Sequence, residues 1–332
     1  MSVAPPRASI PLPGTAIRVR VPASSANLGP GFDSIGVALG VWDDYEFEVT
    51  ARAGLVIEVT GEGAAFVPRD ASHLVHRALV TGFAQLGLPS PEHLRLVAHG
   101  RIPHSRGLGS SASAIVAGVV AAHGLSCLHD SGAAPGAAVD IDLALVNDLA
   151  SELEGHPDNA SASVYGGLTV SWTVDAGMPR AGRTGTARIA VHEDLRPVLL
   201  VPATTLATHK ARAVLPATVP HHEAAQGAGR AALLVEAVSR RPDLLLAATR
   251  DWLHQEPRRP AFPATMALVD HLRAQGHAAV VSGAGPSVLV LTTVDLEDDV
   301  VVPADLGGEQ AWERLAPGIP DGGVVVTALG GA

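Results

Sequence analysis

The chain has 332 residues, a formal net charge of −10 and 47% hydrophobic residues. This length accommodates two globular domains of ordinary size, each with its own core. The negative charge and the lack of a long basic run argue against nucleic acid or an anionic membrane surface as a partner. The longest apolar run, residues 114–122, is too short to span a bilayer. The single cysteine, Cys127, excludes an intrachain disulfide and suits a reducing compartment, so we expect a cytoplasmic protein.

The N-terminal segment is rich in proline and lacks the apolar core of a signal peptide, which predicts a disordered tail over residues 1–16. Residues 17–22 then alternate apolar and polar side chains, as in a half-buried strand. The next stretch, residues 23–36, contains three glycines together with Asn27 and Asp33, which predicts a loop. Such a loop is either a tight turn with local Asx hydrogen bonds or a functional loop held by a scaffold.

Apolar periodicity and turn residues predict the remaining elements. We expect strands at residues 37–41, 45–49, 56–59, 94–98, 166–172, 196–201 and 323–328, and two strands around a glycine turn within 278–291. We expect helices at residues 73–86, 112–122, 140–154, 224–238, 242–253, 264–274 and 309–315. This mixed order predicts an α+β fold rather than a doubly wound sheet. A connection rich in Gly, Arg and Pro at residues 175–185 suggests a boundary between two domains, 17–175 and 186–332.

One stretch between a predicted strand and a small, apolar helix combines two glycines with several serines: Pro103, His104, Ser105, Arg106, Gly107, Leu108, Gly109, Ser110, Ser111, Ala112 and Ser113. Helix N-termini carry unpaired N–H groups that attract anions, and glycine lets the backbone approach phosphate oxygens closely. We therefore favour a phosphate-binding loop over a simple capped helix. The ordinary P-loop is excluded because the single lysine, Lys210, lies outside any glycine-rich loop.

A dinucleotide-binding loop is an alternative, because residues 107–112 fit G-x-G-x-x-G/A and Asp130 lies at about the expected offset. Residues 103–106, however, separate this loop from its strand, whereas the Rossmann turn follows its strand directly. Residues 126–136 also resemble a loop rather than a second strand. The dinucleotide interpretation is therefore the weaker one.

A second polar group lies where the predicted helix 140–154 ends, and it comprises Glu154, His156, Asp158 and Asn159. An exposed, polar helix end is the simpler interpretation of His156 and Asp158. Glu154 differs, because an acidic side chain at a helix C-terminus opposes the helix dipole. A bound metal ion would relieve that repulsion.

Three segments of the second half of the chain carry further candidates. Residues 208–212 and 254–259 place arginines beside loop signals, and the planar fork of arginine matches carboxylate or phosphate, although each could also be ordinary surface arginine. Residues 282–287, Ser-Gly-Ala-Gly-Pro-Ser, are either a hairpin turn or backbone packed against the first glycine loop.

Together these stretches resemble the GHMP small-molecule kinases and, within them, the branch that phosphorylates homoserine. Residues 103–113 are similar to the family's nucleotide loop, and residues 282–287 to its C-terminal glycine motif. Residues 21–33 are similar to a motif of the homoserine branch, with which residues 154–159 and 208–212 also agree.

The resemblance implies two α+β lobes with ATP and substrate between them. An N-terminal ATP-binding lobe of ribosomal-S5-domain-2-like fold would span residues 17–175, and a ferredoxin-like lobe residues 186–332. It implies that ATP phosphorylates the hydroxyl of L-homoserine, with residues 103–113 around the triphosphate. Ser110 and Glu154 would hold Mg²⁺.

The resemblance also implies roles for individual side chains. Asn27 would orient the hydroxyl, Asp33 would pair with the ammonium, and Arg212 and Arg258 would bind the carboxylate. The pocket would be completed by His156 and Asn159, with Thr208 near the γ-phosphate. Asn159 stands where mevalonate kinases resemble one another in having a carboxylate base, so transfer would depend mainly on positioning. Neither nucleic acid nor membrane is expected as a partner, and a homodimer stays open.

The chain departs from the branch's usual pattern at three places. Residues 160–163 are Ala-Ser-Ala-Ser where Val-Ala-Pro-Ala is usual, His73 replaces an asparagine near the adenine, and Glu256-Pro257 precedes Arg258 in place of Pro-Tyr. Two alternatives remain. Another GHMP kinase, such as a mevalonate-type kinase, would not need Asp33. A non-catalytic binding protein of this fold would have no need of Ser110, Glu154 and the glycine loop.

Overall fold

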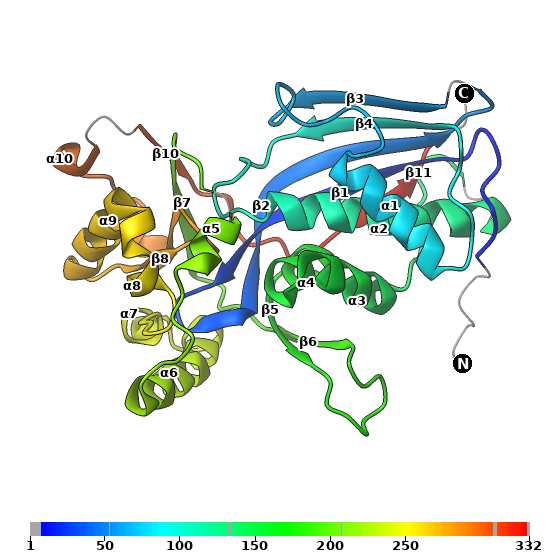
Figure 1. The fold of residues 1–332 in the computed structure, drawn as a ribbon. Helices are drawn as coiled ribbons and strands as arrows, with labels where there is room; N and C mark the ends of the chain where they lie inside the picture. The colour runs from blue at the N-terminus through cyan, green and yellow to red at the C-terminus, as the bar shows by residue number, and fades with distance from the viewer. Residues whose placement is uncertain (1–7, 53, 132–133, 207, 308–310, 331–332) are drawn as a thin grey trace.

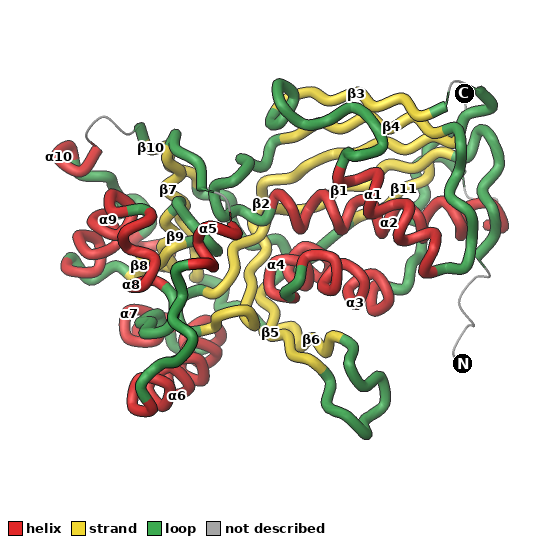
Figure 2. The backbone as a smooth tube through the Cα atoms, in the orientation of Figure 1, coloured by secondary structure: helices red, strands yellow, loops and turns green. Residues whose placement is uncertain are grey.

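Two β-sheets, each with helices packed against it, organise the chain (Figures 1 and 2). The computed structural model describes residues 8–52, 54–131, 134–206, 208–307 and 311–330. The first sheet has the strand order β11-β1-β2-β4-β3, with β5 paired to β2 and β6 paired to β5. Its strands are β1 (Ala16–Asn27), β2 (Gly31–Val49), β3 (Leu55–Gly61), β4 (Leu94–Gly100), β5 (Leu168–Thr173), β6 (Thr184–Ile189) and β11 (Val325–Ala328). The β3–β4 pair is parallel and the other pairs are antiparallel.

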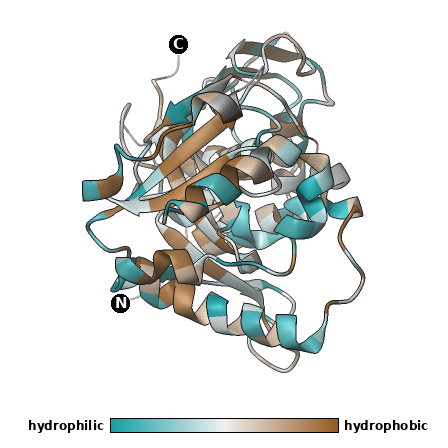
Figure 3. Ribbon diagram, turned by 90° about the vertical axis from the view of Figure 1, so that its left-hand side faces the viewer, coloured by the Kyte–Doolittle hydropathy of each residue, from teal (hydrophilic) through white to brown (hydrophobic). Residues whose placement is uncertain are grey.

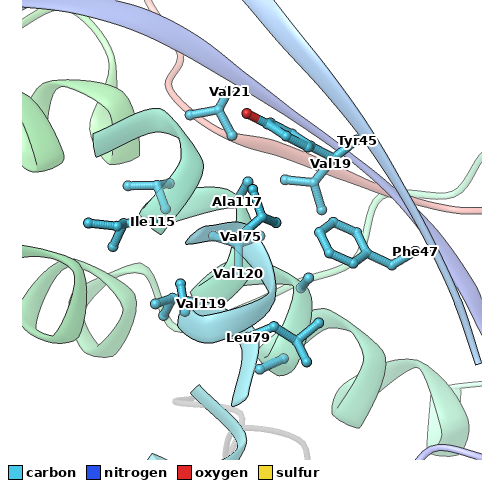
Figure 4. Close-up of a cluster of buried hydrophobic side chains, with 14 of the residues drawn as sticks. Val19, Val21, Tyr45, Phe47, Val75, Leu79, Ile115, Ala117, Val119 and Val120 are labelled. Atoms are coloured by element: carbon cyan, nitrogen blue, oxygen red, sulfur yellow. The ribbon is translucent and has the colours of Figure 1, made fainter. Parts of the chain in front are cut away.

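Four helices cover one face of the first sheet: α1 (Leu74–Gln85), α2 (Ser110–Ser131), α3 (Leu143–Glu154) and α4 (Pro157–Tyr165). Alternate residues of the strands point toward these helices, as strand geometry requires. Figure 4 shows Val19, Val21, Tyr45 and Phe47 of the sheet, Val75 and Leu79 of α1, and Ile115, Val119 and Val120 of α2. The helix α2 is long and apolar enough to cross a membrane by length and composition over Ser110–Leu128, but 78% of that stretch is buried, as in the core helix of a globular domain.

The second sheet is antiparallel, in the order β10-β7-β9-β8. Its strands are β7 (Leu195–Pro202), β8 (Ala278–Val281), β9 (Val288–Thr293) and β10 (Trp312–Leu315). The helices of this region are α5 (Thr208–Ala213), α6 (His221–Ser239), α7 (Leu245–Ala248), α8 (Gln255–Arg258), α9 (Pro263–Ala274) and α10 (Ala304–Gly307), with short 3₁₀ turns at Pro242–Leu244, Arg259–Ala261 and Val294–Leu296. Apolar segments, brown in Figure 3, follow the central strands, while outer helices carry hydrophilic, teal segments.

The central strand β7 buries both of its faces, because the second sheet is covered on both sides. Leu199 and Val201 point into a core that also contains Leu39 of β2 and Leu28 of the turn between β1 and β2. Val198 and its alternating neighbours point the other way, into a core shared with α9. The two sheets are therefore joined by continuous apolar packing, which fixes the relative position of the loops between them.

The sheets do not divide the chain at one point. β6 pairs with β5, and β11 returns from the end of the chain to pair with β1. The expected segment 186–332 thus contributes most of β6 and all of β11 to the first sheet, so the expected limits at 175 and 186 do not coincide with the sheets. Strand pairing between distant segments leaves no local signal in composition.

The start of the chain differs from the expected disordered tail. Residues 1–7 lie outside the described part, but residues 8–15 make defined contacts and β1 begins at Ala16. The backbone N–H of Ser9 donates to the carbonyl of Ser126 at 3.2 Å, and that of Gly14 donates to Val49 at 2.7 Å. The prediction is therefore wrong for residues 8–16, because main-chain hydrogen bonds hold a proline-rich segment whose composition suggested no structure.

Two predicted helices are also wrong. Residues 242–253 form only a 3₁₀ turn and the short helix α7, and Asp251 instead accepts hydrogen bonds from the N–H groups of Leu253, His254 and Gln255. Of the predicted helix 309–315, residues 309 and 310 lie outside the described part, and Trp312–Leu315 form the edge strand β10. Pairing with β7 overrides the weak helical pattern there.

Candidate active site

The first site element is the turn between β1 and β2, which lies where a longer loop was expected. Residues 23–27 continue β1, and β2 already begins at Gly31. The backbone is left-handed at Asn27 (φ 71°), Leu28 (φ 45°) and Asp33 (φ 55°), a conformation that Asn and Asp tolerate better than most residues. The side-chain amide of Asn27 donates to the carbonyl of Gly283 at 2.9 Å, and its Oδ1 accepts from the N–H of Asp33 at 3.0 Å. Asn27 is thus buried and fixed in orientation.

The glycine loop before α2 packs against strand β1 and against the loop between β8 and β9. Gly107 (φ 73°) and Gly109 (φ 70°) are left-handed. A Cβ atom on Gly107 would lie 2.1 Å from the carbonyl oxygen of Ser282, and one on Gly109 would lie 2.2 Å from Oγ of Ser24. The hydroxyl of Ser282 donates to the Gly107 carbonyl at 2.7 Å. Residues 282–287 thus meet both interpretations, because they form the hairpin turn between the antiparallel strands β8 and β9 and also pack against the first glycine loop.

Arg106 links the glycine loop to the second sheet. Its guanidinium donates to the carbonyls of Pro202 at 2.9 Å, Ala203 at 3.1 Å and His104 at 3.2 Å. These main-chain acceptors hold the side chain against β7. Within the loop, main-chain N–H groups and serine hydroxyls are thus better placed than Arg106 to meet an anion.

Glu154, the last residue of α3, lies beside the N-terminus of α2. Its Oε2 accepts a hydrogen bond from the hydroxyl of Ser111 at 2.9 Å. Burial raises the pKa of the Glu154 carboxyl, and the Ser111 hydrogen bond and the nearby His156 offset only part of this. The oxygen donors of Ser110, Ser111 and Glu154 all line one cavity, which is the donor chemistry that Mg²⁺ prefers.

The polar group after Glu154 is buried, not an exposed helix end. Gly155 adopts the left-handed conformation (φ 84°) that ends α3, and Pro157 begins α4. His156 Nδ1 lies 2.7 Å from Oδ1 of Asp158, whose residue is only 1% exposed. Burial disfavours the imidazolium, but the hydrogen bond and charge of Asp158, with the charge of Glu154, outweigh it and raise the pKa of His156. Asn159 accepts a hydrogen bond from the hydroxyl of Ser24 at 3.0 Å.

Asp33 and Arg212 face each other across the two sheets. Asp33 lies at the start of β2 and Arg212 lies in α5, yet Nη1 of Arg212 is 3.0 Å from Oδ2 of Asp33 and Nη2 bonds the other carboxylate oxygen. The two expected substrate ligands therefore form a bidentate ion pair with one another, with side chains 34% and 38% exposed. The side chain of Thr208, at the start of α5, lies outside the described part of the structure.

Arg258 is nearly inaccessible to solvent, at 2% exposure. Its Nε donates to the carbonyl of Ala211 at 3.0 Å, and its Nη1 lies 3.1 Å from Nδ1 of His254. The guanidinium also lies over the ring of Phe32, 5.5 Å from the centroid. Burial and the like charge of Arg212 lower the pKa of Arg258 to about 10, so it stays charged at neutral pH.

The eight expected side chains that could be located, all but Thr208, line one cavity of about 110 Å³: Asn27, Asp33, Ser110, Glu154, His156, Asn159, Arg212 and Arg258. A second cavity, of about 290 Å³, shares Ser105, Ser110 and Ser111 with the first and extends under α1 past His73. The expected loop members Ala112 and Ser113 are buried within the first turn of α2 instead. The glycine loop and the N-terminus of α2 thus separate a small polar cavity from a larger neighbour.

The sequence analysis gave no individual role to Phe32, Asp158 or His254, and it did not pair Ser111 with Glu154. Phe32 and Asp158 line the cavity, whereas His254 lies behind it. Asp158 is nearly inaccessible, and Phe32 carries Arg212 and Arg258 over its ring and stacks on His254 at 5.2 Å. The spacing of four residues between His254 and Arg258 was the available signal, since such residues face one side of a helical turn.

Known proteins of the same kind resemble this chain over nearly its whole length. The N-terminal domain model of the GHMP kinases matches residues 73–167. A homoserine kinase from Streptomyces coelicolor is 48% identical over 314 residues, which cover 95% of each chain. One from Streptomyces avermitilis is 50% identical over 294 residues, covering 89% of this chain and 90% of the relative.

Solved structures show the same fold. The homoserine kinase from Cytophaga hutchinsonii superimposes with a TM-score of 0.76 at 22% identity, covering 94% of this chain and 97% of that one. The mevalonate kinase from L. major superimposes with a TM-score of 0.63 at 17% identity, covering 93% and 99%. The predicted two-lobed α+β fold of the GHMP type is confirmed by this likeness.

Proposed function

This chain belongs to the GHMP kinases and, within them, to the homoserine kinases, and on that premise we propose that its smaller cavity holds L-homoserine beside the γ-phosphate of ATP. As a homoserine kinase it is a phosphotransferase that uses ATP to phosphorylate the hydroxyl of homoserine. The single observation that carries the proposal is the convergence of Asn27, Asp33, Arg212 and Arg258, from three distant segments, on one cavity beside the glycine loop.

The nucleotide belongs on the glycine-loop side. The N-terminus of α2 supplies N–H groups and a partial positive charge for phosphate oxygens, as at other anion-binding helix ends. The base would lie in the 290 Å³ cavity, near His73, whose buried Nδ1 has no partner among the described residues. Residues 103–111 would thus surround the triphosphate, with its γ-phosphate directed toward the smaller cavity.

Ser110 and Glu154 would hold Mg²⁺, with Ser111 as a third oxygen donor at the same point. A divalent ion there would neutralise phosphate charge and offset the burial that raises the pKa of Glu154. The site fits a hard cation, since serine hydroxyls and a carboxylate are oxygen donors.

The smaller cavity would bind the amino acid through both of its charges. A buried ammonium and a buried carboxylate each require a partner of opposite charge. Asp33 would take the ammonium and the two arginines the carboxylate, so the Asp33–Arg212 pair would exchange partners when the substrate enters. His156 and Asn159 would line the remaining wall.

The transfer itself needs alignment more than a strong base. The substrate oxygen forms a bond to the γ-phosphorus as the bond from that phosphorus to the leaving oxygen of ADP breaks. The proton of the hydroxyl would pass to an oxygen of the transferred phosphoryl group and from there to solvent. Asn27, held by its hydrogen bonds to Gly283 and Asp33, would orient the hydroxyl. Asn159 would lie on the other side of the hydroxyl. Thr208 would lie near the γ-phosphate. Loose phosphoryl-transfer transition states are stabilised chiefly by position and charge.

A coupled assay of ADP release tests this proposal with a matched pair of substrates. ATP and Mg²⁺ with L-homoserine should give rapid turnover, whereas mevalonate, which has no ammonium for Asp33, should give almost none. Equal turnover of both would instead indicate a GHMP kinase of broader or different specificity. Binding of both without ADP release would indicate a non-catalytic protein. We also propose a cytoplasmic location for the enzyme.

A further inference from the structure

His254 lies behind the amino-acid side of the cavity, in contact with Arg258 and Phe32, two residues that line it. The residue is fully buried, at 0% exposure. Its two ring nitrogens have different partners: Nε2 lies 2.8 Å from the carbonyl oxygen of Gly29, and Nδ1 lies 3.1 Å from Nη1 of Arg258. A carbonyl can only accept a hydrogen bond and a guanidinium can only donate one. The pair of partners therefore requires a neutral imidazole with its proton on Nε2.

The two partners belong to opposite parts of the site. Gly29 lies in the left-handed turn that orients Asn27 and Asp33, and a Cβ atom on Gly29 would lie 2.3 Å from the carbonyl oxygen of Thr249. Arg258 comes from α8, in the segment that packs on that turn. The imidazole also stacks on Phe32, the ring over which Arg258 lies.

We propose that His254 is a positioning residue for substrate recognition: its neutral imidazole fixes the Arg258 guanidinium relative to the turn that carries Asn27 and Asp33. Arg258 has a flexible side chain and reaches the cavity from α8, so a fixed acceptor on one of its nitrogens limits its freedom before substrate arrives. Prearranging a ligand-binding group in this way lowers the entropic cost of binding. The inference rests on the proposed contact between Arg258 and the homoserine carboxylate.

The electrostatic surroundings are consistent with the neutral form. The charged groups that face the imidazole are Asp251 at the start of the same segment, Arg258 one turn later, and Asp33 across the turn. Burial lowers the pKa of His254, Arg258 lowers it further, and the two carboxylates oppose this. Protonation would add a second N–H to the ring, on Nδ1, where it would point at the Arg258 guanidinium and break the contact.

Two isosteric substitutions separate the two contacts of the imidazole. His254→Asn places an amide oxygen near the position of Nδ1, where it can accept from Arg258 but cannot reach Gly29. His254→Gln places its amide near Nε2, where it can donate to Gly29 but leaves Arg258 without its acceptor. We expect His254→Gln to lower the ratio of kcat/KM for L-homoserine to that for L-homoserine amide by roughly tenfold to a hundredfold, the range of one hydrogen bond to a charged group. We expect His254→Asn to keep most of this ratio, and the KM for ATP to stay unchanged in both.

Matched controls and a second measurement keep the test decisive. His123 is also buried, bonds Gln85 at 3.2 Å and lies away from the cavity, so His123→Gln should leave the ratio unchanged. If the parent fails to discriminate homoserine from its amide, the proposed carboxylate contact is wrong. If His254→Gln discriminates homoserine from its amide as strongly as the parent does, the proposed role of His254 is excluded. The same holds if His254→Asn and His254→Gln lower the ratio equally. Should the variants not fold, ¹⁵N NMR of histidine in the parent must still show the Nε2–H tautomer at neutral pH, and a proton on Nδ1 would overturn the inference.

Discussion

The glycine-loop side of the cavity is built mostly from main-chain atoms, whereas the amino-acid side is built from charged side chains that reach in from β2, α5 and α8. On the first side, left-handed Gly107 and Gly109 bring backbone against backbone, and the N-terminus of α2 supplies the positive end of a dipole. On the second side, Asp33, Arg212 and Arg258 depend on one another and on His254. Substitutions on the glycine-loop side should therefore weaken binding through steric clash, and substitutions on the amino-acid side through loss of charge pairing.

The largest expected effect comes from the point where the two sides meet. Glu154→Gln keeps the size of the side chain and removes the charge that a hard cation requires. We expect kcat/KM at limiting Mg²⁺ to fall by about a hundredfold or more, because metal stabilisation of transferring phosphate is worth several kcal/mol. Activity equal to that of the parent under these conditions would exclude Glu154 as a ligand.

The same variant should also change the dependence of stability on pH. A carboxyl whose pKa is raised in the folded state stabilises the fold fully below its unfolded pKa and loses this contribution as pH rises through the folded value. At neutral pH and without Mg²⁺, Glu154→Gln should therefore melt at the same or a higher temperature than the parent. The difference should shrink below about pH 4, where the parent's carboxyl is protonated in both states. A lower melting temperature at neutral pH would contradict this sign.

The next effect belongs to the side-chain network. Arg212→Ala removes one partner of the proposed carboxylate contact and leaves Asp33 without its ion pair. Loss of one member of a buried pair costs roughly 2–5 kcal/mol, and because these side chains are more than a third exposed we expect the low end, about thirtyfold in kcat/KM for homoserine. Arg212→Lys should recover only part of this, since a point charge cannot replace the bidentate fork.

Homoserine amide is the control for Arg212. Its neutral end needs no arginine, so Arg212→Ala should lose much of the parent's preference for homoserine over the amide while its affinity for ATP stays unchanged. An undiminished preference would show that Arg212 does not contact the carboxylate.

A smaller effect is expected on the main-chain side. Gly109→Ala adds a Cβ 2.2 Å from Oγ of Ser24 at a left-handed residue, so we expect a loss of about 1–3 kcal/mol in stability and weaker binding of ATP by calorimetry. Gly87→Ala is the matched control, because Gly87 has φ 71° but a Cβ there would meet nothing within 4 Å. Gly87→Ala should lower stability without changing ATP affinity. Parallel losses of ATP affinity in both variants would remove Gly109 from the nucleotide site.

The smallest effect separates two arginines that are neighbours in sequence. Arg259, next to Arg258, pairs with Glu256 and Asp270 on the surface. Arg259→Ala should change stability by less than about 1 kcal/mol and leave the KM for homoserine unchanged, since exposed ion pairs contribute little. Arg258→Ala should raise that KM strongly. Equal effects on KM would place the substrate elsewhere.

The features that could be predicted from the sequence are those set by neighbouring residues. The glycine loop was predictable because glycine and serine spacing directly encodes left-handed turns and a helix N-terminus. Glu154 was predictable because it opposes a helix dipole locally. The burial of Asp158 was not, because it depends on packing of α4 against β2 and β1, far away in sequence.

Two strands and one ion pair also could not be predicted from local sequence, because they depend on contacts between distant segments. β11 joins the first sheet only through pairing with β1, and the edge strand β10 depends on pairing with β7. The mutual pairing of Asp33 and Arg212 follows from how the two sheets pack, although each residue separately was expected in the pocket.

The ion pair between Asp33 and Arg212 also affects which ligands the smaller cavity can bind. Asp33 and Arg212 already neutralise each other, so a ligand with a single charge would separate the pair and leave one member uncompensated. A zwitterion brings both countercharges at once and exchanges one internal ion pair for two intermolecular ones. Selection for α-amino acids over simple amines or simple carboxylic acids would then arise from what the protein must give up, as much as from the contacts that it gains.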